Sequence, residues 1–283
     1  MQEPSEKDPL PAYDRPPVVE TILGVQFERL PRFKMAHLGG FWKTLDTHDW
    51  PTVSDAPPLE PQFERFADFA KWTTQGIQLR LTKDLSPRLQ IRNSDGDRMI
   101  QVQNGRVHFN WLGQAQGQYP HYEEVRKGFL WTLDRFTQFL AQEDLGKLQP
   151  NQWEVTYVNH IPKGTVWDEP DDWEFFRPLG LVPTIDGVIR GESFTGGWHF
   201  VIPGQRGRLH VEWQHAVIPE SEQQETVVLT LTARGPLQQT EEDLQPVVAG
   251  LDLGRETIVR AFKGFMNNAA NRYWGLKYAS NES

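Results

Sequence analysis

The stretch that decides the fold runs from residue 88 to residue 113 and reads RLQIRNSDGDRMIQVQNGRVHFNWLG. It contains three short runs of alternating residues, separated by the dipeptides Asp95-Gly96 and Asn104-Gly105. Asp-Gly and Asn-Gly are the strongest short signals for a β-hairpin, because the favoured two-residue turn needs a positive φ at both central residues. The stretch therefore predicts a three-stranded antiparallel meander.

The two turns also fix the register of the meander. The Asn-Gly turn places Gln103 opposite Arg106 and Gln101 opposite His108, and the Asp-Gly turn places Gln90 opposite Gln101. The two assignments agree, because together they gather the large apolar side chains on one face. That face contains Leu89, Ile91, Ile100, Val102, Val107 and Phe109. A slip of one residue at either turn would mix the two faces, so the agreement supports both registers.

The opposite face of the meander is the candidate binding surface. Its long polar side chains are Arg88, Gln90, Arg92, Gln101, Gln103, Arg106, His108 and Asn110. Residues 88–113 carry four arginines and two aspartates, hence a local net charge of +2 in a chain of net charge -9. Arginine forks match carboxylates and phosphates, so the face suits an anionic small molecule or a protein partner. The alternative is a face that meets water, as one face of an antiparallel sheet commonly does.

The elements around the meander complete one α+β half. A strand is predicted at 18–27, a helix at about 35–45 and a loop at 50–62. A second helix is predicted at 121–142, where apolar residues recur every three or four positions. The apolar stripe of this helix should cover the apolar face of the meander.

The remaining sequence repeats the same order of elements. A strand at 153–162 is followed by a short helix at 168–176, three antiparallel strands and a closing helix at 252–271. We therefore predict an α+β fold of two similar, pseudo-duplicated halves. Each half is a curved antiparallel sheet gripped by a long C-terminal helix, in a helix-grip-like or saddle-like arrangement. The predicted organisation is a disordered leader at 1–17, an N-terminal half at 18–148 and a C-terminal half at 149–283.

Composition excludes several classes of function. The chain has no cysteine, which removes disulfides, thiol nucleophiles and cysteine-held metal centres. The net charge of -9 argues against nucleic acid as the main ligand, because neutralising phosphates needs clustered Lys and Arg. No signal peptide is visible and no apolar run reaches the length of about 18 residues that suits a membrane span. We expect a cytoplasmic protein without a membrane segment or a cofactor.

Two groups of residues offer a possible chemistry. His210, Glu212 and His215 are types that bind divalent metals, and His199 would join them if it lay opposite His210. His160 has the reference pKa of a general base, but no serine nucleophile in a G-x-S-x-G elbow accompanies it. Because neither group is complete, we predict neither catalytic residues nor metal ligands.

Several segments carry a resemblance to a known family. They are PPVVETILGVQF near the start, IQVQNGRVHFNW in the meander, WEVTYVNHIP in the middle and YWG near the end. With these segments the chain resembles a sporadically distributed family of uncharacterised bacterial proteins. Relatives often have a histidine where the last helix begins, and this chain has Gly254 and Arg255 there. The resemblance implies a bacterial cytoplasmic protein and no specific reaction.

The sequence thus favours a non-catalytic binding or interaction protein. We expect it to bind an anionic small molecule or a protein partner through a polar sheet face or the cleft between the halves. One alternative is a hydrolase that uses His160 or the group of His210, Glu212 and His215. Another is a component of a bacterial defence or toxin–antidote system, which the patchy distribution of the family suggests.

Overall fold

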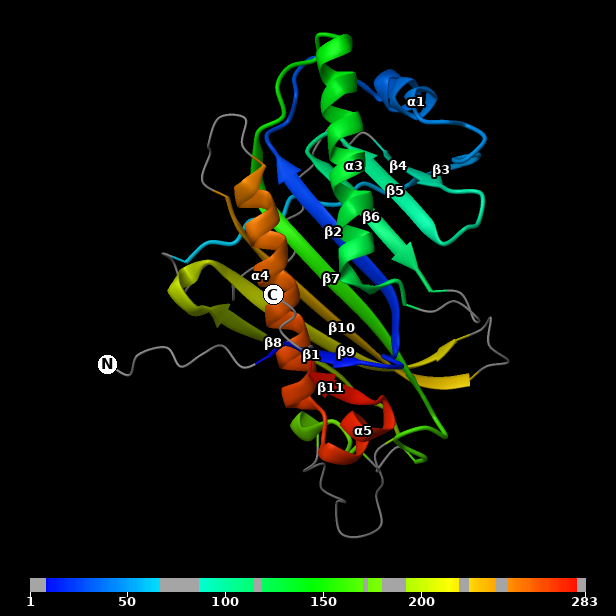
Figure 1. Cartoon of the computed structure of the whole chain (residues 1–283), viewed down its shortest axis with the longest axis vertical. Coiled ribbons are helices and arrows are strands. Elements are labelled where there is room, and N and C mark those ends of the chain that lie inside the picture. Colours follow the sequence, from blue (N-terminus) through cyan, green and yellow to red (C-terminus); the bar gives the residue numbers. More distant parts are fainter. Residues whose placement is uncertain are drawn as a thin grey trace.

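A nine-stranded antiparallel sheet forms the frame of the protein (Figure 1). The computed structural model describes residues 9–66, 87–113, 119–169, 173–179, 192–218, 224–237 and 244–278. The strand order is β3-β4-β5-β6-β2-β7-β10-β9-β8. The bounds are β2 Val18–Phe27, β3 Thr52–Ala56, β4 Arg88–Arg92, β5 Arg98–Gln103, β6 Arg106–Leu112, β7 Pro150–Pro162, β8 Thr195–Ile202, β9 Gly207–Ile218 and β10 Gln224–Pro236.

The meander has the predicted register. Gln103 pairs with Arg106 and Gln101 pairs with His108, while Gln90 lies opposite Gln101. All six large apolar residues of its inner face are buried. The expected loop at 50–62 is wrong in part, because residues 52–56 form β3 and pair with β4 at the edge of the sheet. This strand is short and mostly exposed, so its sequence lacks the alternating apolar pattern by which strands are recognised.

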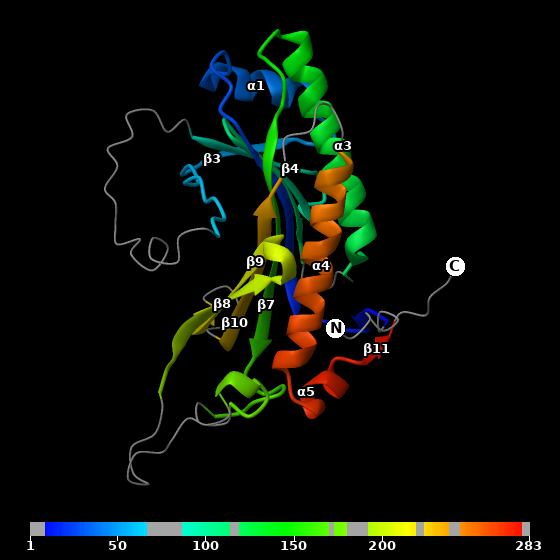
Figure 2. The same ribbon diagram turned by 90° about the vertical axis from the view of Figure 1, so that its left-hand side faces the viewer.

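Two long helices cover one face of the sheet (Figure 2). Helix α3 (His121–Gln142) has the predicted bounds, and α1 (Met35–Thr44) matches the expected helix at 35–45. The predicted helix at 252–271 is instead two helices, α4 (Gln245–Phe265) and α5 (Asn268–Tyr273). Pro246 is tolerated in the first turn of α4, where its missing N–H would be unpaired in any case.

Glycines allow both long helices to approach the sheet closely. A Cβ on Gly128 of α3 would lie 2.3 Å from the ring of Phe109. On α4, a Cβ on Gly250 would lie 2.3 Å from the ring of Trp153, and one on Gly254 would lie 2.8 Å from the same ring. These aromatic rings therefore fill the space directly beneath the helix backbones, where any larger helix residue would collide with them.

The two ends of the described chain meet in a second, two-stranded sheet. Strand β1 (Pro11–Tyr13) pairs with β11 (Leu276–Tyr278), and Tyr13 Oη donates a 2.6 Å hydrogen bond to the buried Asn271. The prediction of a disordered leader over 1–17 is therefore wrong for residues 11–13. A polar, proline-rich sequence gives no periodic signal, so a partner strand from the other end of the chain could not be anticipated.

The fold is α+β with an antiparallel sheet, as predicted. In both predicted halves the first strand lies beside the last one, giving β2-β6-β5-β4 on one side and β7-β10-β9-β8 on the other. The first strands β2 and β7 pair antiparallel at the centre. The expected short helix at 168–176 does not form over the described residues 173–176, where a 3-10 turn follows at Arg177–Leu179. None of the described helices is both long and apolar enough to cross a membrane.

Candidate functional site

The eight candidate residues lie together on the sheet face opposite α3 and α4. We call this the polar sheet face, and it continues across β2 and β7 to β10 and β9. Gln101, Gln103, Arg106, His108 and Asn110 are buried, whereas Arg88 and Gln90 are half-buried and Arg92 is exposed. The centre of this face is therefore covered by another part of the protein and does not meet water.

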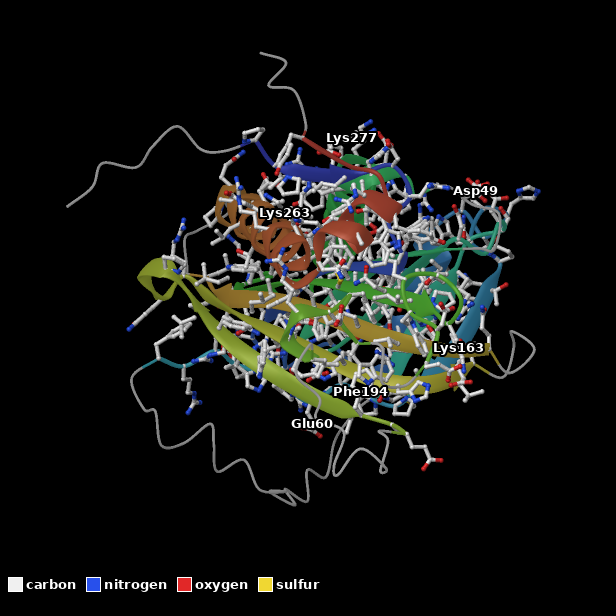
Figure 3. All side chains as sticks on the ribbon, turned by 90° about the horizontal axis from the view of Figure 1, so that it is seen from below. Asp49, Glu60, Lys163, Phe194, Lys263 and Lys277 are labelled. Carbon is white, nitrogen blue, oxygen red and sulfur yellow. The ribbon has the colours of Figure 1, made fainter. Side chains whose placement is uncertain are left out.

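An extended segment at residues 57–66, here called the strap, covers the centre of the polar sheet face. The strap lies across the sheet from the long helices, as the positions of Glu60 and of Lys263 on α4 show (Figure 3). Two sheet glutamines each bind both main-chain groups of one strap residue. Gln26 Nε2 donates to the carbonyl of Gln62 over 2.8 Å, and Gln26 Oε1 accepts from its N–H over 3.1 Å. Gln103 does the same with Leu59, over 2.8 and 2.9 Å.

A third glutamine extends this pattern to the middle of the sheet. Gln152 of β7 accepts a 2.9 Å hydrogen bond from the N–H of Glu64 and donates to the carbonyl of Gln62. Arg106 adds a long contact of 3.4 Å to the carbonyl of Glu60. The strap thus receives from side chains the main-chain hydrogen bonds that a neighbouring strand would otherwise supply.

The carboxylate of Glu64 lies among the side chains of Arg208, His210 and Arg234. Its Oε1 lies 2.7 Å from Arg234 Nε and 2.7 Å from His210 Nε2, and its Oε2 contacts Arg208. Burial alone would raise the pKa of Glu64, but the hydrogen bonds and charges of His210 and Arg234 outweigh it and lower the pKa to about 2. Glu64 is therefore ionised at neutral pH, and it is the one buried residue of the strap.

A buried histidine lies on the same face, in a row of paired residues next to the row that binds the strap. His108 of β6 pairs with Gly24 of β2, which pairs with Glu154 of β7. A Cβ on Gly24 would lie 2.1 Å from the His108 ring, so glycine leaves the ring room to approach Glu154, with 3.5 Å between Nε2 and Oε1. Burial lowers the pKa of His108 to about 4, although the charge of Glu154 opposes this. His108 is therefore neutral at pH 7.

The remaining polar residues of the meander bind one another. Gln101 Nε2 donates to Asn110 Oδ1 over 2.8 Å, and Asn110 Nδ2 donates to Glu20 Oε1 over 2.6 Å. Gln90 Nε2 donates a hydrogen bond to Gln101 Oε1 over 3.2 Å. Within the predicted binding set, Gln103 and Arg106 thus contact the strap, while Gln101 and Asn110 form a support beneath the surface.

Sequence reasoning missed the strap and the pocket for Glu64. The strap lies in a stretch without hydrophobic periodicity, and its partners Arg208 and Arg234 lie 144 and 170 residues away from Glu64. One available signal was the alternation of Arg208, His210 and Glu212 along β9, which places polar side chains on one face of that strand.

The group of His210, Glu212 and His215 does not come together. Successive residues of a strand point to opposite faces, so His215 lies on the other face from His210 and Glu212. His215 lies 3.2 Å from Glu225, and its ring stacks on Phe194. His199 does lie opposite His210, with 2.8 Å between their Nδ1 atoms, but His210 is bound to Glu64 through its other nitrogen.

His160 of β7 pairs with Val228 of β10, and burial lowers the pKa of its half-buried side chain. The described part of the chain holds no group of three or more His, Asp or Glu side chains arranged to bind a metal ion. In comparisons with known proteins, no family model matches the chain and no curated protein is significantly similar to it.

Proposed function

We propose that the protein is a non-catalytic binding module whose polar sheet face binds an extended, acidic segment of a protein partner. In the chain alone, the strap at residues 57–66 occupies this face. The observation that carries the proposal is the set of paired hydrogen bonds from Gln26 and Gln103 to single strap residues. Such recognition of a main chain by side chains gives affinity for an extended segment, in the way that strand addition does.

The binding of main-chain groups does not depend on the strap's own side chains. A carboxamide that pairs with both the N–H and the C=O of a residue can do so with any residue except proline, which lacks the N–H. Gln26, Gln103 and Gln152 are therefore suited to any chain that follows the same path. Selectivity would come from the pocket formed by Arg208, His210 and Arg234, which suits a carboxylate.

The strap fits its site loosely, which supports its replacement by a partner. Glu64 is its one buried residue, and Phe63 is 47% exposed, so little of its apolar surface is removed from water. A cavity of about 200 Å³ remains between the strap and the sheet, beside Leu59, Phe63 and Gly105. A partner segment with larger apolar side chains at these positions could fill this space and gain stability that the strap lacks.

The proposal is tested with a capped peptide of the strap sequence, PPLEPQFERF, added to full-length protein. In a Glu64→Lys variant the strap should be repelled by Arg208 and Arg234, which frees the face for the peptide. We expect the peptide to bind this variant about tenfold more tightly than the unaltered protein, in which the strap competes. A Glu60→Lys variant makes the same charge change at an exposed strap position and should bind the peptide as weakly as the unaltered protein.

A second peptide, with glutamine at the position of Glu64, tests the carboxylate pocket. It should bind the Glu64→Lys variant about tenfold more weakly, because the cluster of Arg208, His210 and Arg234 loses its charged partner. Failure of both peptides to bind a folded Glu64→Lys variant would contradict the proposal. So would equal affinity for the two peptides.

Two finer interpretations belong with this proposal. The equivalent strand orders of the two halves support pseudo-duplication about the central β2–β7 pair. The segments quoted above support membership of the bacterial family, and with it a cytoplasmic place and a role in a defence or toxin–antidote system. A protein partner with an acidic extended segment would suit such a role, and co-purification from a bacterial host would test it.

A further inference from the structure

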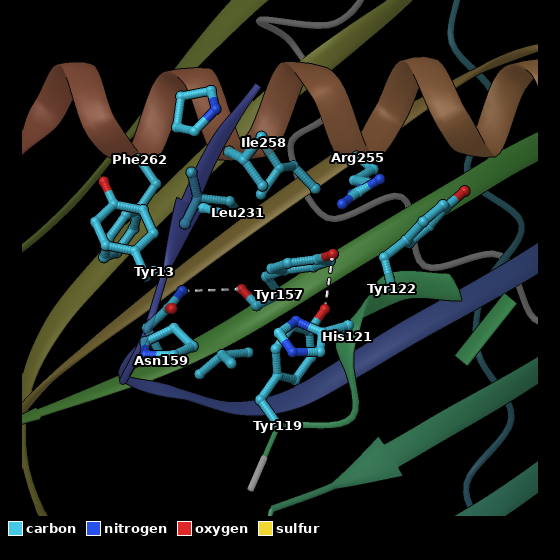
Figure 4. A pocket seen from close by; sticks show the side chains of 15 residues that line it. Tyr13, Tyr119, His121, Tyr122, Tyr157, Asn159, Leu231, Arg255, Ile258 and Phe262 are labelled. Atoms are coloured by element: carbon cyan, nitrogen blue, oxygen red, sulfur yellow. Dashed lines mark hydrogen bonds between the residues drawn. The ribbon is translucent and has the colours of Figure 1, made fainter. Parts of the chain in front are cut away.

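A cavity of about 80 Å³ lies on the helix-covered face of the sheet, at the junction of the two halves (Figure 4). Its walls come from β1, the segment before α3, α3 itself, β7, β10 and α4. Its lining includes four tyrosines, Tyr13, Tyr119, Tyr122 and Tyr157, and the apolar residues Val18, Leu231, Ile258 and Phe262. The strand β1 from the start of the chain forms one wall, so the cavity is completed by the pairing of the two chain ends.

Two hydroxyls and a guanidinium lie at one end of the cavity, whereas the Asn159 amide, near Tyr13, is bound to the main-chain carbonyls of Tyr157 and Leu229. The hydroxyls of Tyr119 and Tyr157 lie 3.0 Å apart, and the Arg255 side chain extends from α4 toward them. The opposite end is formed by the rings of Tyr13 and Phe262. The cavity therefore has an apolar body and a polar head, which is the usual construction of a site for a small organic molecule.

The groups at the polar end are hydrogen-bond donors. Burial raises the pKa of both Tyr119 and Tyr157, so the two phenols stay protonated at neutral pH. They share one hydrogen bond, which uses one of their two O–H hydrogens and leaves the other for a bound molecule. Arg255 binds Glu123 over 2.8 Å through Nη1, and a guanidinium has five N–H donors in all. A ligand must therefore present acceptor oxygens at this end.

The two phenol hydroxyls of Tyr119 and Tyr157 are buried at a cost in folding free energy. Burying a hydroxyl costs free energy that hydrogen bonds must offset, and here the offset comes from the bond between Tyr119 and Tyr157 and from the interaction of Tyr119 with Thr21. The two hydroxyls lie near the Arg255 guanidinium, so the three groups together can bind one ligand. The Arg255 guanidinium extends toward both phenols and forms an ion pair with Glu123, and its remaining N–H donors suit an anion better than a neutral acceptor.

We propose that this cavity binds a small carboxylic acid with an apolar body. The carboxylate accepts hydrogen bonds from Tyr157 and Arg255, and the apolar body packs among Tyr13, Ile258 and Phe262. This site is separate from the polar sheet face, because it lies under α4 on the other side of the sheet.

The test uses phenylacetate and hexanoate as probes, with the full-length protein, in calorimetric titrations and ligand-observed NMR. Both carboxylates should bind saturably, and phenylacetamide, which lacks the charge, should bind about tenfold more weakly than phenylacetate. Tyr157→Phe and Arg255→Gln should each weaken phenylacetate binding by about tenfold. Arg260→Gln, on the same helix but outside the lining of this cavity, is the matched control and should leave binding unchanged.

Thermal unfolding of each variant shows whether it is folded, and Arg255→Lys provides a second measurement because it keeps the charge. The lysine variant should bind phenylacetate more tightly than the glutamine variant. Absence of saturable binding of both carboxylates to the unaltered protein would overturn the proposal. So would equal binding of phenylacetate to the unaltered protein and to a folded Tyr157→Phe variant. Binding of the strap peptide to the polar sheet face should not change in any of these variants.

Discussion

The centres of both faces of the sheet are buried, but by different means. On one face, α3 and α4 bury large apolar side chains such as Phe109 and Trp153. On the other, the strap covers glutamines, arginines and a histidine, and it is held by hydrogen bonds and one carboxylate. Apolar burial is nondirectional and large, whereas the net gain from a hydrogen bond is about 1 kcal/mol. The difference supports the proposal that one face maintains the fold while the strap on the other face can be replaced by a partner segment.

The largest effect is expected on the helix-covered face. Phe109→Ala should lower the free energy of unfolding by about 3–5 kcal/mol, because it removes a buried ring against which Gly128 of α3 packs. Urea denaturation measures this loss. Trp198→Ala is the control, since Trp198 is 41% exposed and should cost much less. Equal losses in the two variants would contradict the account of this face.

Acid should act mainly on the strap-covered face. The pKa of His108 falls from 6.5 to about 4 on folding, so the unfolded state binds more protons between these values and stability falls as the pH falls from 6.5 to 4. This lowering of the His108 pKa corresponds to a loss of about 3 kcal/mol in the free energy of unfolding. Glu154, Arg106 and Arg88 are the charges that act on this histidine. Denaturation at pH 7 and at pH 4 should show that His108→Asn removes most of this loss.

Other titratable groups also change the free energy of unfolding at low pH, but they do so in both the unaltered protein and the His108→Asn variant. The pKa values of His160 and His199 are also lowered, first by burial, so they add to the loss in the same direction and remain in the variant. Glu64 acts at lower pH, because its stabilising effect is lost as the pH falls from 4.5 to about 2. A His108→Asn variant that lost as much stability at pH 4 as the unaltered protein would refute the assignment.

A smaller effect compares two glycines. Gly24→Ala should cost about 1–3 kcal/mol, because its Cβ would lie 2.1 Å from the buried His108 ring and the ring would have to move. Gly39→Ala should instead stabilise the protein by about 1 kcal/mol, because Gly39 lies within α1 with no neighbour within 4 Å of its Cβ position. Thermal denaturation of both variants tests the prediction, and a neutral Gly24→Ala would show that the ring is not confined.

The sequence predicted the helix-covered face well because its information is local. The register of the meander follows from Asn104-Gly105 and Asp95-Gly96, and the bounds of α3 follow from its apolar period. The candidate residues were correctly grouped on one face, but their cover was not foreseen. Glu64 meets Arg208, His210 and Arg234 only in the folded chain, and the strap has no periodic pattern that would connect it to this site.

The central claim, that the strap can leave its face without unfolding of the core, is tested most directly by native-state hydrogen exchange. The amides of Leu59, Gln62 and Glu64 are bound by glutamine side chains. We predict that they exchange by local opening with a free energy well below that of β6 amides such as Phe109. Glu64→Gln should accelerate all three by about tenfold and leave β6 unchanged, because only the strap loses its charged contact. Strap amides that exchange with the same opening free energy as β6, in both proteins, would contradict the account.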